Sequence, residues 1–479
     1  MPSLKKNLIY NIVYQILILI VPFITSPYVS RILGPEGLGT YSVTTAIVKY
    51  FTLFALLGMT NYGNRTIAKN KNEKENLSIT FWNLYYFQLI MASIVLTLYI
   101  IYAVSLGTRS YGVISLCQIP YMLSTVFEVS WLFYGMENFK GIVTRNAIVK
   151  VVTMLSVFLF VKEKNDVWIY VLINSTSLLV GQLCLWPFVK KYVSWKKPQL
   201  KLIISHFKPN CVLMVSVIAV SIYTLMDKIM IEWLSNTMEV GYYENTEKIL
   251  TIANNAAGAI GTVMLPRISN LCSVGENRQV IKYIDKSMKY IMIISIALAF
   301  GVASVSGSFS VVYFGKEFEN CKILLITIAP AIIFYAWSNI IRNQFLLPND
   351  MDSVFVIATI MAALVNLLLN GILIPKYGSL GAVLGTVGAQ FTELMYQSFQ
   401  VRKLLPLKKY FLGIIPFILI GDIMFFCCSQ IEKCLGISFL TLVFQIGVGA
   451  IIYLVTSYIY LYFTKDEMLV AMMKKMGKK

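Results

Sequence analysis

Runs of about 20 apolar residues recur along the whole chain, and they constrain its fold more than any other feature. They lie at about 8–28, 41–60, 79–104, 113–133, 145–161, 168–188, 210–233, 248–266, 290–312, 323–341, 354–374, 381–400, 411–428 and 438–462. Of the 479 residues, 57% are hydrophobic and only 13% are charged, against roughly 25% charged in soluble proteins. Such a run crosses a bilayer as a helix, because a helix satisfies its own backbone hydrogen bonds in lipid. The sequence therefore predicts an all-α polytopic membrane protein with about fourteen transmembrane helices.

The distribution of lysine and arginine predicts how these helices are oriented. With the N-terminus placed inside, the inner segments hold 30 basic residues and the outer segments hold nine, while Lys49 and Lys228 remain within spans. Cytoplasmic loops carry an excess of basic residues, so we expect both termini in the cytoplasm. The same bias accounts for the net charge of +18, and no nucleic-acid partner is expected.

The order of the runs predicts four parts. Residues 1–190 would form an N-lobe of helices 1–6, and residues 210–404 a C-lobe of helices 7–12. The basic linker 191–209 places Leu200, Ile203, Ile204 and Phe207 at i, i+3, i+4 and i+7, which is typical of an amphipathic helix on the inner membrane surface. Residues 405–479 would add helices 13–14 and a basic cytoplasmic tail.

A short internal repeat relates the two predicted lobes. A Gly-Thr-Tyr motif at 39–41 follows the first span, and a Gly-Tyr-Tyr motif at 241–243 follows the seventh, 202 positions later. The same offset carries Arg65 onto Arg267. Six spans in each half mean that both halves enter the membrane from the same side. The repeats would therefore be parallel, with a central cavity between them.

Several kinds of chemistry are excluded by composition. His206 is the only histidine, which argues against a histidine-based metal centre or proton relay. The eight cysteines form no C-x-x-C pair, and no phosphate-binding G-x-x-x-x-G-K-[ST] motif is present. The longest outer connection, near 235–246, is too short for the outer domain that a membrane-embedded glycosyltransferase or polymerase needs. We expect neither enzymatic activity nor a metal or organic cofactor.

Basic residues in or beside the spans are the candidate substrate-binding residues: Arg31, Lys49, Lys228, Arg65 and Arg267. A cation at membrane depth is costly and therefore indicates a function or a buried partner. If these helices line the cavity, it is cationic and suits a phosphate or pyrophosphate, which arginine binds through two parallel hydrogen bonds. Each of these residues also has a structural alternative. Arg31 would be an ordinary loop residue, and Lys49 would snorkel to the interface or form an ion pair. Lys228 would belong to a polar structural cluster, and Arg65 and Arg267 would only be topology signals.

Embedded carboxylates are the candidate ion-coupling residues, namely Asp227, Glu128 and Glu393. Each could carry a proton if burial favours its neutral form, and each could equally be the silent partner of a cation. Asp227 and Lys228 are adjacent and point about 100° apart on a helix, so each is expected to need its own partner.

Several segments together resemble a known family. Residues 30–42 (SRILGPEGLGTYS), 131–135 (WLFYG), 227–230 (DKIM), 265–269 (LPRIS) and 314–318 (FGKEF) are similar to signatures of bacterial polysaccharide repeat-unit flippases of the Wzx type. This family shares a superfamily with the multidrug and toxin extruders and the lipid II flippase. The resemblance implies two six-helix lobes with two extra helices, alternating access, and a cavity-facing arginine at Arg31. Unlike the multidrug branch, the first span lacks an embedded carboxylate.

The resemblance and the basic residues together predict a flippase. It would move a polyprenyl-pyrophosphate-linked oligosaccharide from the inner to the outer leaflet of the bacterial cytoplasmic membrane, for capsule or another surface polysaccharide. Membrane lipids are expected partners, and a polysaccharide polymerase and assembly proteins are further candidates. The alternatives are a cation-coupled drug or sugar exporter of the same superfamily, and a membrane-embedded glycosyltransferase or polymerase.

Overall fold

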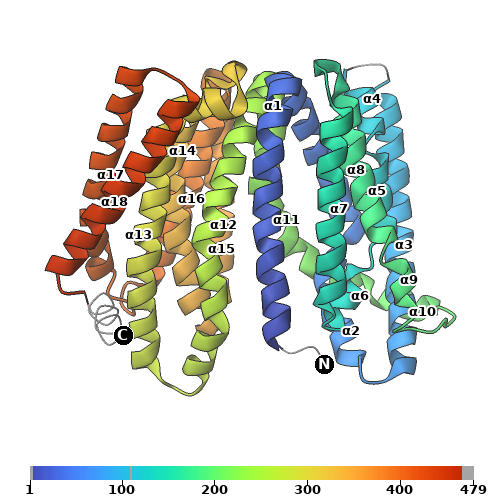
Figure 1. Cartoon of the computed structure of the whole chain (residues 1–479). Coiled ribbons are helices and arrows are strands. Elements are labelled where there is room, and N and C mark those ends of the chain that lie inside the picture. Colours follow the sequence, from blue (N-terminus) through green and yellow to red (C-terminus); the bar gives the residue numbers. More distant parts are fainter. Residues whose placement is uncertain (1–3, 108–109, 467–479) are drawn as a thin grey trace. The chain divides into compact units, whose positions relative to one another are not determined.

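The protein folds into helices that divide into two compact units (Figure 1). The computed structural model describes residues 4–107 and 110–466, so the C-terminal part of the predicted basic tail lies outside the described residues. The first unit, Met1–Glu244, and the second, Asn245–Lys479, are joined within helix α12. The predicted linker and α11 thus belong to the first unit, and the lobe boundaries at 190 and 210 stay predictions.

The helices have the following bounds. In the first unit they are α1 (Leu4–Leu56), α2 (Met59–Asn70), α3 (Lys74–Ser105), α4 (Ser110–Leu116), α5 (Ile119–Val126), α6 (Ser130–Gly135), α7 (Phe139–Phe160), η1 (Lys164–Asp166), α8 (Val167–Leu183), α9 (Trp186–Val189), α10 (Leu200–Ser205) and α11 (Phe207–Leu234), followed by the start of α12 (Thr237–Ser273). The second unit continues α12 and adds α13 (Asn277–Phe309), η2 (Ser310–Phe314), η3 (Lys316–Phe318), α14 (Cys321–Ile341), η4 (Arg342–Leu346), η5 (Leu347–Asn349), α15 (Asp352–Tyr377), α16 (Ser379–Val401), α17 (Leu407–Leu435) and α18 (Phe439–Phe463).

Ten stretches of the described residues are long and apolar enough to cross a membrane. The first, Ile20–Asn70, merges the two runs that the sequence separates as the first and second spans. The predicted seventh, eighth and twelfth spans fall in α11, α12 and α16, which are not among the ten.

Helix α1 is kinked at Gly34, in the stretch between the first two predicted spans. Gly34 has φ 68° and ψ −179°, a backbone conformation that is not helical and that glycine adopts without a Cβ clash. Pro35 follows directly; proline removes a backbone N–H and disfavours helical geometry in the residue before it. The kink therefore has a local cause, and the chain continues beyond it as helix.

The predicted fourth span is interrupted between α4 and α5 and again between α5 and α6, and sequence reasoning missed both. An interruption at membrane depth exposes backbone carbonyls that need a partner. The amide nitrogen of Gln88 on α3 donates to the carbonyl oxygens of Thr125 and Glu128, each at 2.8 Å. The indole of Trp131 in turn donates to the Gln88 side-chain oxygen at 2.9 Å. A fully buried glutamine on a neighbouring helix thus stabilises the second interruption.

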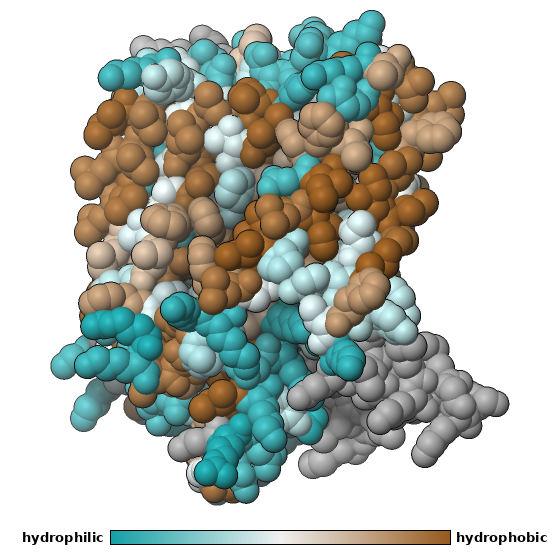
Figure 2. Space-filling view, turned by 90° about the vertical axis from the view of Figure 1, so that its left-hand side faces the viewer, coloured by the Kyte–Doolittle hydropathy of each residue, from teal (hydrophilic) through white to brown (hydrophobic). Residues whose placement is uncertain are grey.

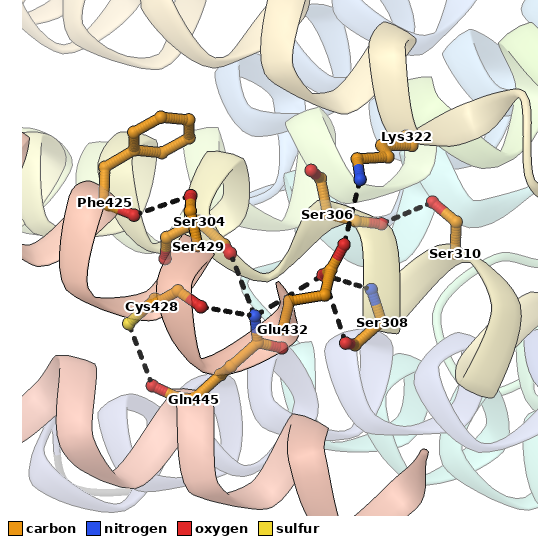
Figure 3. A network of polar contacts seen from close by, with 10 residues as sticks. All are labelled: Ser304, Ser306, Ser308, Ser310, Lys322, Phe425, Cys428, Ser429, Glu432 and Gln445. Atoms are coloured by element: carbon orange, nitrogen blue, oxygen red, sulfur yellow. Dashed lines mark hydrogen bonds and ion pairs between the residues drawn. The ribbon is translucent and has the colours of Figure 1, made fainter. Parts of the chain in front are cut away.

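In the second unit, α17 and α18 pack on α13 and are held there by a buried polar network (Figure 3). The Glu432 carboxylate accepts hydrogen bonds from the Ser308 backbone N–H at 3.0 Å and from the Lys322 ammonium at 2.9 Å. It lies so close to Gly307 that a Cβ there would be 2.2 Å from Glu432 Oε1. The Gln445 amide of α18 donates to the Cys428 carbonyl at 3.0 Å. At the other end of α17, Asp285 of α13 accepts from Lys409 at 2.7 Å and from the Tyr410 hydroxyl at 2.5 Å.

The surface of the second unit on the side of α17 and α18 fits a lipid environment. Figure 2 shows hydrophobic side chains across the middle of this face and hydrophilic ones gathered towards its two ends. Apolar side chains exposed on α18 include Leu440, Leu454 and Phe463. An apolar surface of this extent is what a bilayer-embedded protein presents to acyl chains.

Candidate functional site

Embedded charges of the first unit gather where α1, α11 and the start of α12 meet. The Lys228 ammonium lies 2.6 Å from Glu244 Oε2, and the Ser42 hydroxyl donates to the same oxygen at 2.5 Å. The Tyr243 hydroxyl donates to Asp227 Oδ2 at 2.5 Å. The side chains of Lys228 and Glu244 are 12% and 10% exposed, and Asp227 is buried. We call these five residues the ionic cluster.

The geometry of the α11–α12 hairpin explains the pairing. Adjacent helical residues point in different directions, so neither Asp227 nor Lys228 can pair simply with the other. The tight turn after Leu234 folds α12 back, and it places Tyr243 opposite Asp227 and Glu244 opposite Lys228. Each member of the adjacent pair has its own partner, as the sequence predicted. In this conformation the positive charge of Lys228 is therefore compensated by Glu244.

A third carboxylate lies nearer to the turn of the same hairpin. The Tyr111 hydroxyl of α4 donates to Glu232 Oε1 at 2.5 Å and lies 2.6 Å from the Thr237 hydroxyl oxygen. Thr237 also donates to Glu232 Oε1, at 3.1 Å. Glu232 Oε2 is buried and makes no hydrogen bond within the described residues. Counting this group and the half-buried Glu239, the hairpin from α11 into α12 carries four buried or half-buried carboxylates and one lysine between Asp227 and Glu244.

Two glycines let α1 and the start of α12 cross at backbone contact. A Cβ added to Gly39 would lie 1.9 Å from the Thr237 carbonyl oxygen, and one added to Gly241 would lie 1.9 Å from the Pro35 carbonyl oxygen. The contact is reciprocal, because positions 35 and 237 and positions 39 and 241 are each 202 apart. Ser42 and Glu244, which are hydrogen-bonded, have the same separation. The repeat found in the sequence thus coincides with a two-fold-like crossing, and small residues there allow the close approach. We call this the glycine crossing.

Phenol, hydroxyl and amide groups surround the ionic cluster along α1. The rings of Tyr41 and Tyr170 meet edge to face with centroids 4.7 Å apart. The Gln118 amide donates to the Thr45 hydroxyl at 3.0 Å. The Tyr50 hydroxyl donates to the backbone carbonyl of Ser221 at 3.3 Å. These groups are suited to hydrogen bonding and ring stacking, as a sugar requires, and they include no nucleophile paired with a general base.

The predicted substrate-binding residues divide between the two units. Arg31, Lys49, Arg65 and Lys228 belong to the first unit. Arg31 is exposed on α1 one turn before the kink, Lys49 is half-buried on the same helix, and Arg65 is exposed on α2. Arg267 belongs to the second unit, where its guanidinium lies 4.7 Å from the centre of the Tyr283 ring. A common cavity for all five stays a prediction.

The other two predicted coupling residues are not members of the ionic cluster. Glu128 follows the interruption between α5 and α6, where its carboxylate accepts from the Ser130 backbone N–H at 2.8 Å and from the Gln182 amide. Glu393, on α16 of the second unit, is 9% exposed and accepts from the Gln397 amide at 3.0 Å. Both carboxylates thus have neutral hydrogen-bond donors, and their role in ion coupling stays a prediction.

Sequence reasoning missed three groups that complete these sites. Glu244 was not singled out, because it lies within the predicted outer connection near 235–246 and outside the apolar runs. Its position 202 residues after Ser42, inside the repeat, was the available signal. Tyr243 lies in the Gly-Tyr-Tyr motif of the same repeat. Gln88 gave no such signal, since a glutamine in an apolar run has many structural uses.

Comparisons with known proteins point to one family. A family model described as "Polysaccharide biosynthesis protein" matches residues 4–272, and another, described as "Lipid II flippase MurJ", matches residues 239–445. A protein named as an O-antigen transporter in Escherichia coli (strain K12) is 26% identical over 414 residues, which cover 84% of this chain and 98% of that protein. The capsular polysaccharide biosynthesis protein CapF of Staphylococcus aureus is 22% identical over 408 residues, covering 81% of this chain and 97% of that protein.

Two solved structures share the fold. The lipid II flippase MurJ, in an inward closed conformation, superimposes with a TM-score of 0.75 at 16% identity, covering 96% of this chain and 100% of that one. An inward-facing multidrug resistance transporter of the MATE family superimposes with a TM-score of 0.63 at 14% identity, covering 81% of this chain and 94% of that one. At these identities the similarity concerns the fold alone.

Proposed function

Because the chain belongs to the polysaccharide biosynthesis protein family, we propose that it moves a polyprenyl-pyrophosphate-linked oligosaccharide from the inner to the outer leaflet by alternating access. The protein is a multi-pass membrane transporter and not an enzyme. An O-antigen transporter and a capsular polysaccharide protein among its relatives support a lipid-linked glycan as cargo. Capsule or another surface polysaccharide is the proposed product of the pathway.

The single observation that carries the proposal is the ionic cluster in a membrane-embedded helix hairpin. A lipid-linked oligosaccharide has a tail that is stable in the bilayer and a polar, anionic head that is not. The protein would shelter the head beside the polar side chains of α1 and α11 and leave the tail in lipid. No covalent step is needed, because both leaflets hold the same molecule.

Within this proposal the Lys228–Glu244 pair is a switchable contact. When the pyrophosphate arrives, Lys228 would exchange Glu244 for a phosphate oxygen, and Glu244 would keep the hydroxyl of Ser42 as a donor. Arg31 and Lys49 on α1 would supply further positive charge, with Arg31 binding two phosphate oxygens at once. Arg65 and Arg267 are the remaining proposed contacts. An exchange of partners keeps the lysine charge paired throughout, whereas Glu244 would keep only a neutral donor, so the exchange would favour its protonated form.

Coupling to an ion gradient is a separate part of the proposal. Asp227 is the favoured carrier, because it is buried beside Lys228 and holds a hydrogen bond from Tyr243 that a protonated carboxyl would weaken. Glu128 and Glu393 are the other candidates. Replacement of the carrier by the neutral isostere, as in Asp227→Asn, should flatten the pH dependence of transport. An unchanged pH profile would exclude Asp227 as the carrier.

Ligand-dependent thermal unfolding of the purified chain tests the proposed cargo. A ligand that binds only the folded state raises the unfolding midpoint with its concentration. We expect polyprenyl-pyrophosphate oligosaccharide to raise the midpoint, and polyprenol carrying neither phosphate nor sugar to leave it unchanged. Equal shifts with both compounds would mean that only the tail is bound, and would contradict recognition of the head.

A cation-coupled exporter of small molecules is the second candidate function. The excess of carboxylates over lysines in the α11–α12 hairpin favours it, since a cation-coupled site is dominated by acids. In vesicles that contain the protein, uptake of a fluorescent cationic dye driven by a sodium or proton gradient would support this alternative. Dye uptake equal to that of protein-free vesicles would exclude it for that dye class.

A further inference from the structure

The segment between α9 and α11 is the most basic part of the described surface that lies outside the apolar runs. Residues 190–208 contain six lysines and no acidic residue. Lys190, Lys191, Lys197, Lys201 and Lys208 are exposed, whereas Lys196 forms an ion pair with Glu75. We call residues 190–208 the basic strap.

The basic strap is held on α3 by backbone hydrogen bonds and is not a loose tether. The Ser194 N–H donates to the Ser78 hydroxyl at 2.9 Å, and the Ser194 carbonyl accepts from the Trp82 indole at 2.9 Å. The Gln199 N–H donates to the Asn83 side-chain oxygen at 2.8 Å. These contacts fix the strap before any partner binds, so little conformational entropy remains to be lost on binding.

The outward face of the strap is apolar as well as basic. Trp195 is 62% exposed, Leu200 69% and Ile204 62%. The predicted amphipathic pattern holds with one difference: Ile203 is buried in the core of the first unit and anchors the strap, while Leu200, Ile204 and Phe207 point away from it. Exposed aliphatic side chains beside lysines are costly in water and are typical of segments that lie in a lipid headgroup region.

Aromatic residues continue this face onto α3. The ring of Trp195 meets that of Trp82 edge to face, with centroids 4.6 Å apart, and Tyr86 lies next to both. Tryptophan and tyrosine concentrate at the membrane–water interface, where one end of the ring is in lipid and the other in water. The strap therefore lies at interface depth and presents its lysines to headgroups.

The one histidine of the chain adds no charge to this face at neutral pH. The Tyr62 hydroxyl lies 2.9 Å from His206 Nδ1, and burial lowers the pKa of His206 below its ordinary value. The positive charge of the strap consequently comes from lysines alone, which bind anions as point charges without a fixed geometry. Such a surface suits a mobile layer of anionic groups better than one shaped ligand.

We propose that the basic strap and the aromatic residues of α3 beside it form a binding surface for anionic phospholipid headgroups of the adjoining leaflet. The five exposed lysines contact the headgroup phosphates, and Trp195, Leu200 and Ile204 insert between the acyl chains. Charge complementarity selects anionic over zwitterionic lipid, and each lysine contributes to the attraction. This surface is separate from the ionic cluster, so lipid binding there does not depend on the transported cargo.

Quenching of Trp195 by brominated lipids tests the proposal in the full chain. The protein is placed in phosphatidylcholine nanodiscs that contain a second, brominated lipid. This lipid is phosphatidylglycerol in one preparation and phosphatidylcholine in the other, and in both it is brominated near the headgroup end of its acyl chains. The Trp195 signal is the difference between the wild type and Trp195→Phe. We expect brominated phosphatidylglycerol to quench this signal at least about twofold more than brominated phosphatidylcholine, and the preference to shrink at high salt.

A pair of matched variants assigns the preference to the strap. Lys190, Lys191, Lys197 and Lys201 are replaced by glutamine in one variant. Lys282, Lys286, Lys403 and Lys408, which are also exposed, are replaced by glutamine in the other. We expect the first variant to lose the preference and the second, with the same change in net charge, to keep it. If the first variant does not fold, the wild type provides the test: its preference for quenching by brominated phosphatidylglycerol should shrink at high salt.

Two results would overturn the proposal. Equal quenching by both lipids in the wild type would show that no anionic headgroup is selected. An absence of quenching by either lipid would show that Trp195 is not in the bilayer, as it would be if a protein or a second copy of the chain covered the strap.

Discussion

Lys228 and Glu244 form an ion pair that is almost fully removed from solvent. A buried pair of this kind contributes little net stability, but loss of one partner leaves an uncompensated charge that costs about 3–5 kcal/mol. The pair therefore has a structural role even if Lys228 also binds cargo. A variant that removes the lysine alone cannot separate these two roles.

A comparison of single and double variants separates them. We expect Lys228→Met and Glu244→Met each to lower the free energy of unfolding by about 3–5 kcal/mol. The double variant should recover stability, because no unpaired charge remains. If Lys228 binds pyrophosphate, the recovered double variant still transports poorly, which is measured as a translocation rate at equal protein content. Normal transport by the stable double variant would restrict the pair to a structural role.

Arg31 and Lys49 allow a test that depends on side-chain shape as well as charge. Arg31→Lys keeps the charge and loses the two-pronged donor, so it should impair transport less than Arg31→Ala. The alanine variant should slow transport about tenfold or more, since hydrogen bonds to charged groups contribute about 1.5–3 kcal/mol. Lys49→Gln should leave the protein folded and inserted, yet stop export. Transport at the wild-type rate in both Lys49→Gln and Arg31→Ala would contradict an anionic cargo.

What the sequence predicted at the residue scale was which positions are unusual, and not which groups they contact. A charge in an apolar run is visible without a structure, so Lys49, Asp227 and Lys228 were identified. The partner of Lys228 lies sixteen residues further along, on another helix. The packing of α12 against α11 brings the two side chains together, and no local sequence pattern encodes that contact.

At the scale of helices, the glycine crossing fixes how α1 meets the start of α12. Backbone carbonyls occupy the space that a Cβ would need at Gly39 and at Gly241, and a carbonyl cannot move without moving its helix. Gly39→Ala and Gly241→Ala should each lower the free energy of unfolding by about 1–3 kcal/mol, the usual cost of overpacking. Thermal unfolding of the purified chain measures this.

Gly301→Ala is the matched control for the glycine crossing. Gly301 is also in a helix, and a Cβ added there would meet no atom within 4 Å. Since alanine favours helix over glycine, this variant should be as stable as the wild type or slightly more so. Equal stability of all three variants would mean that the helices do not approach as closely as the structure has them.

The kink of α1 and the interruption between α5 and α6 differ in how far they could be predicted. The kink of α1 has its cause in the local sequence, where Gly34 precedes Pro35. The interruption between α5 and α6 has no glycine or proline at its position. It is stabilised by Gln88 of α3, which is distant in sequence, and so it was missed.

At the scale of the whole molecule, the apolar runs and the family signatures were sufficient for the fold class. An all-α polytopic membrane protein is confirmed by the fold shared with MurJ and the MATE transporter. The resemblance to polysaccharide flippases is confirmed by the family model. Membership of helices in lobes is harder to predict, because it depends on which helices pack together; the two compact units divide at Glu244, within α12, and the predicted lobe boundaries stay predictions.

The orientation of the chain in the membrane is a prediction that follows from the 30 inner and nine outer basic residues. Single cysteines are introduced at exposed positions after the native cysteines are replaced. A membrane-impermeant maleimide added outside should label positions 164 and 320, and should not label positions 74 and 197. Labelling at position 197 from outside would contradict the orientation and move the basic strap to the outer leaflet.

The central claim is that the protein carries a lipid-linked oligosaccharide across the bilayer. It is tested most directly in vesicles reconstituted with the full chain and a fluorescent polyprenyl-pyrophosphate oligosaccharide. A membrane-impermeant quencher added outside reports how much label is exposed. We expect the inner-leaflet fraction to become accessible in vesicles with wild-type protein, and to stay protected in protein-free vesicles and in those with Lys49→Gln. Accessibility that develops equally fast in all three would contradict it.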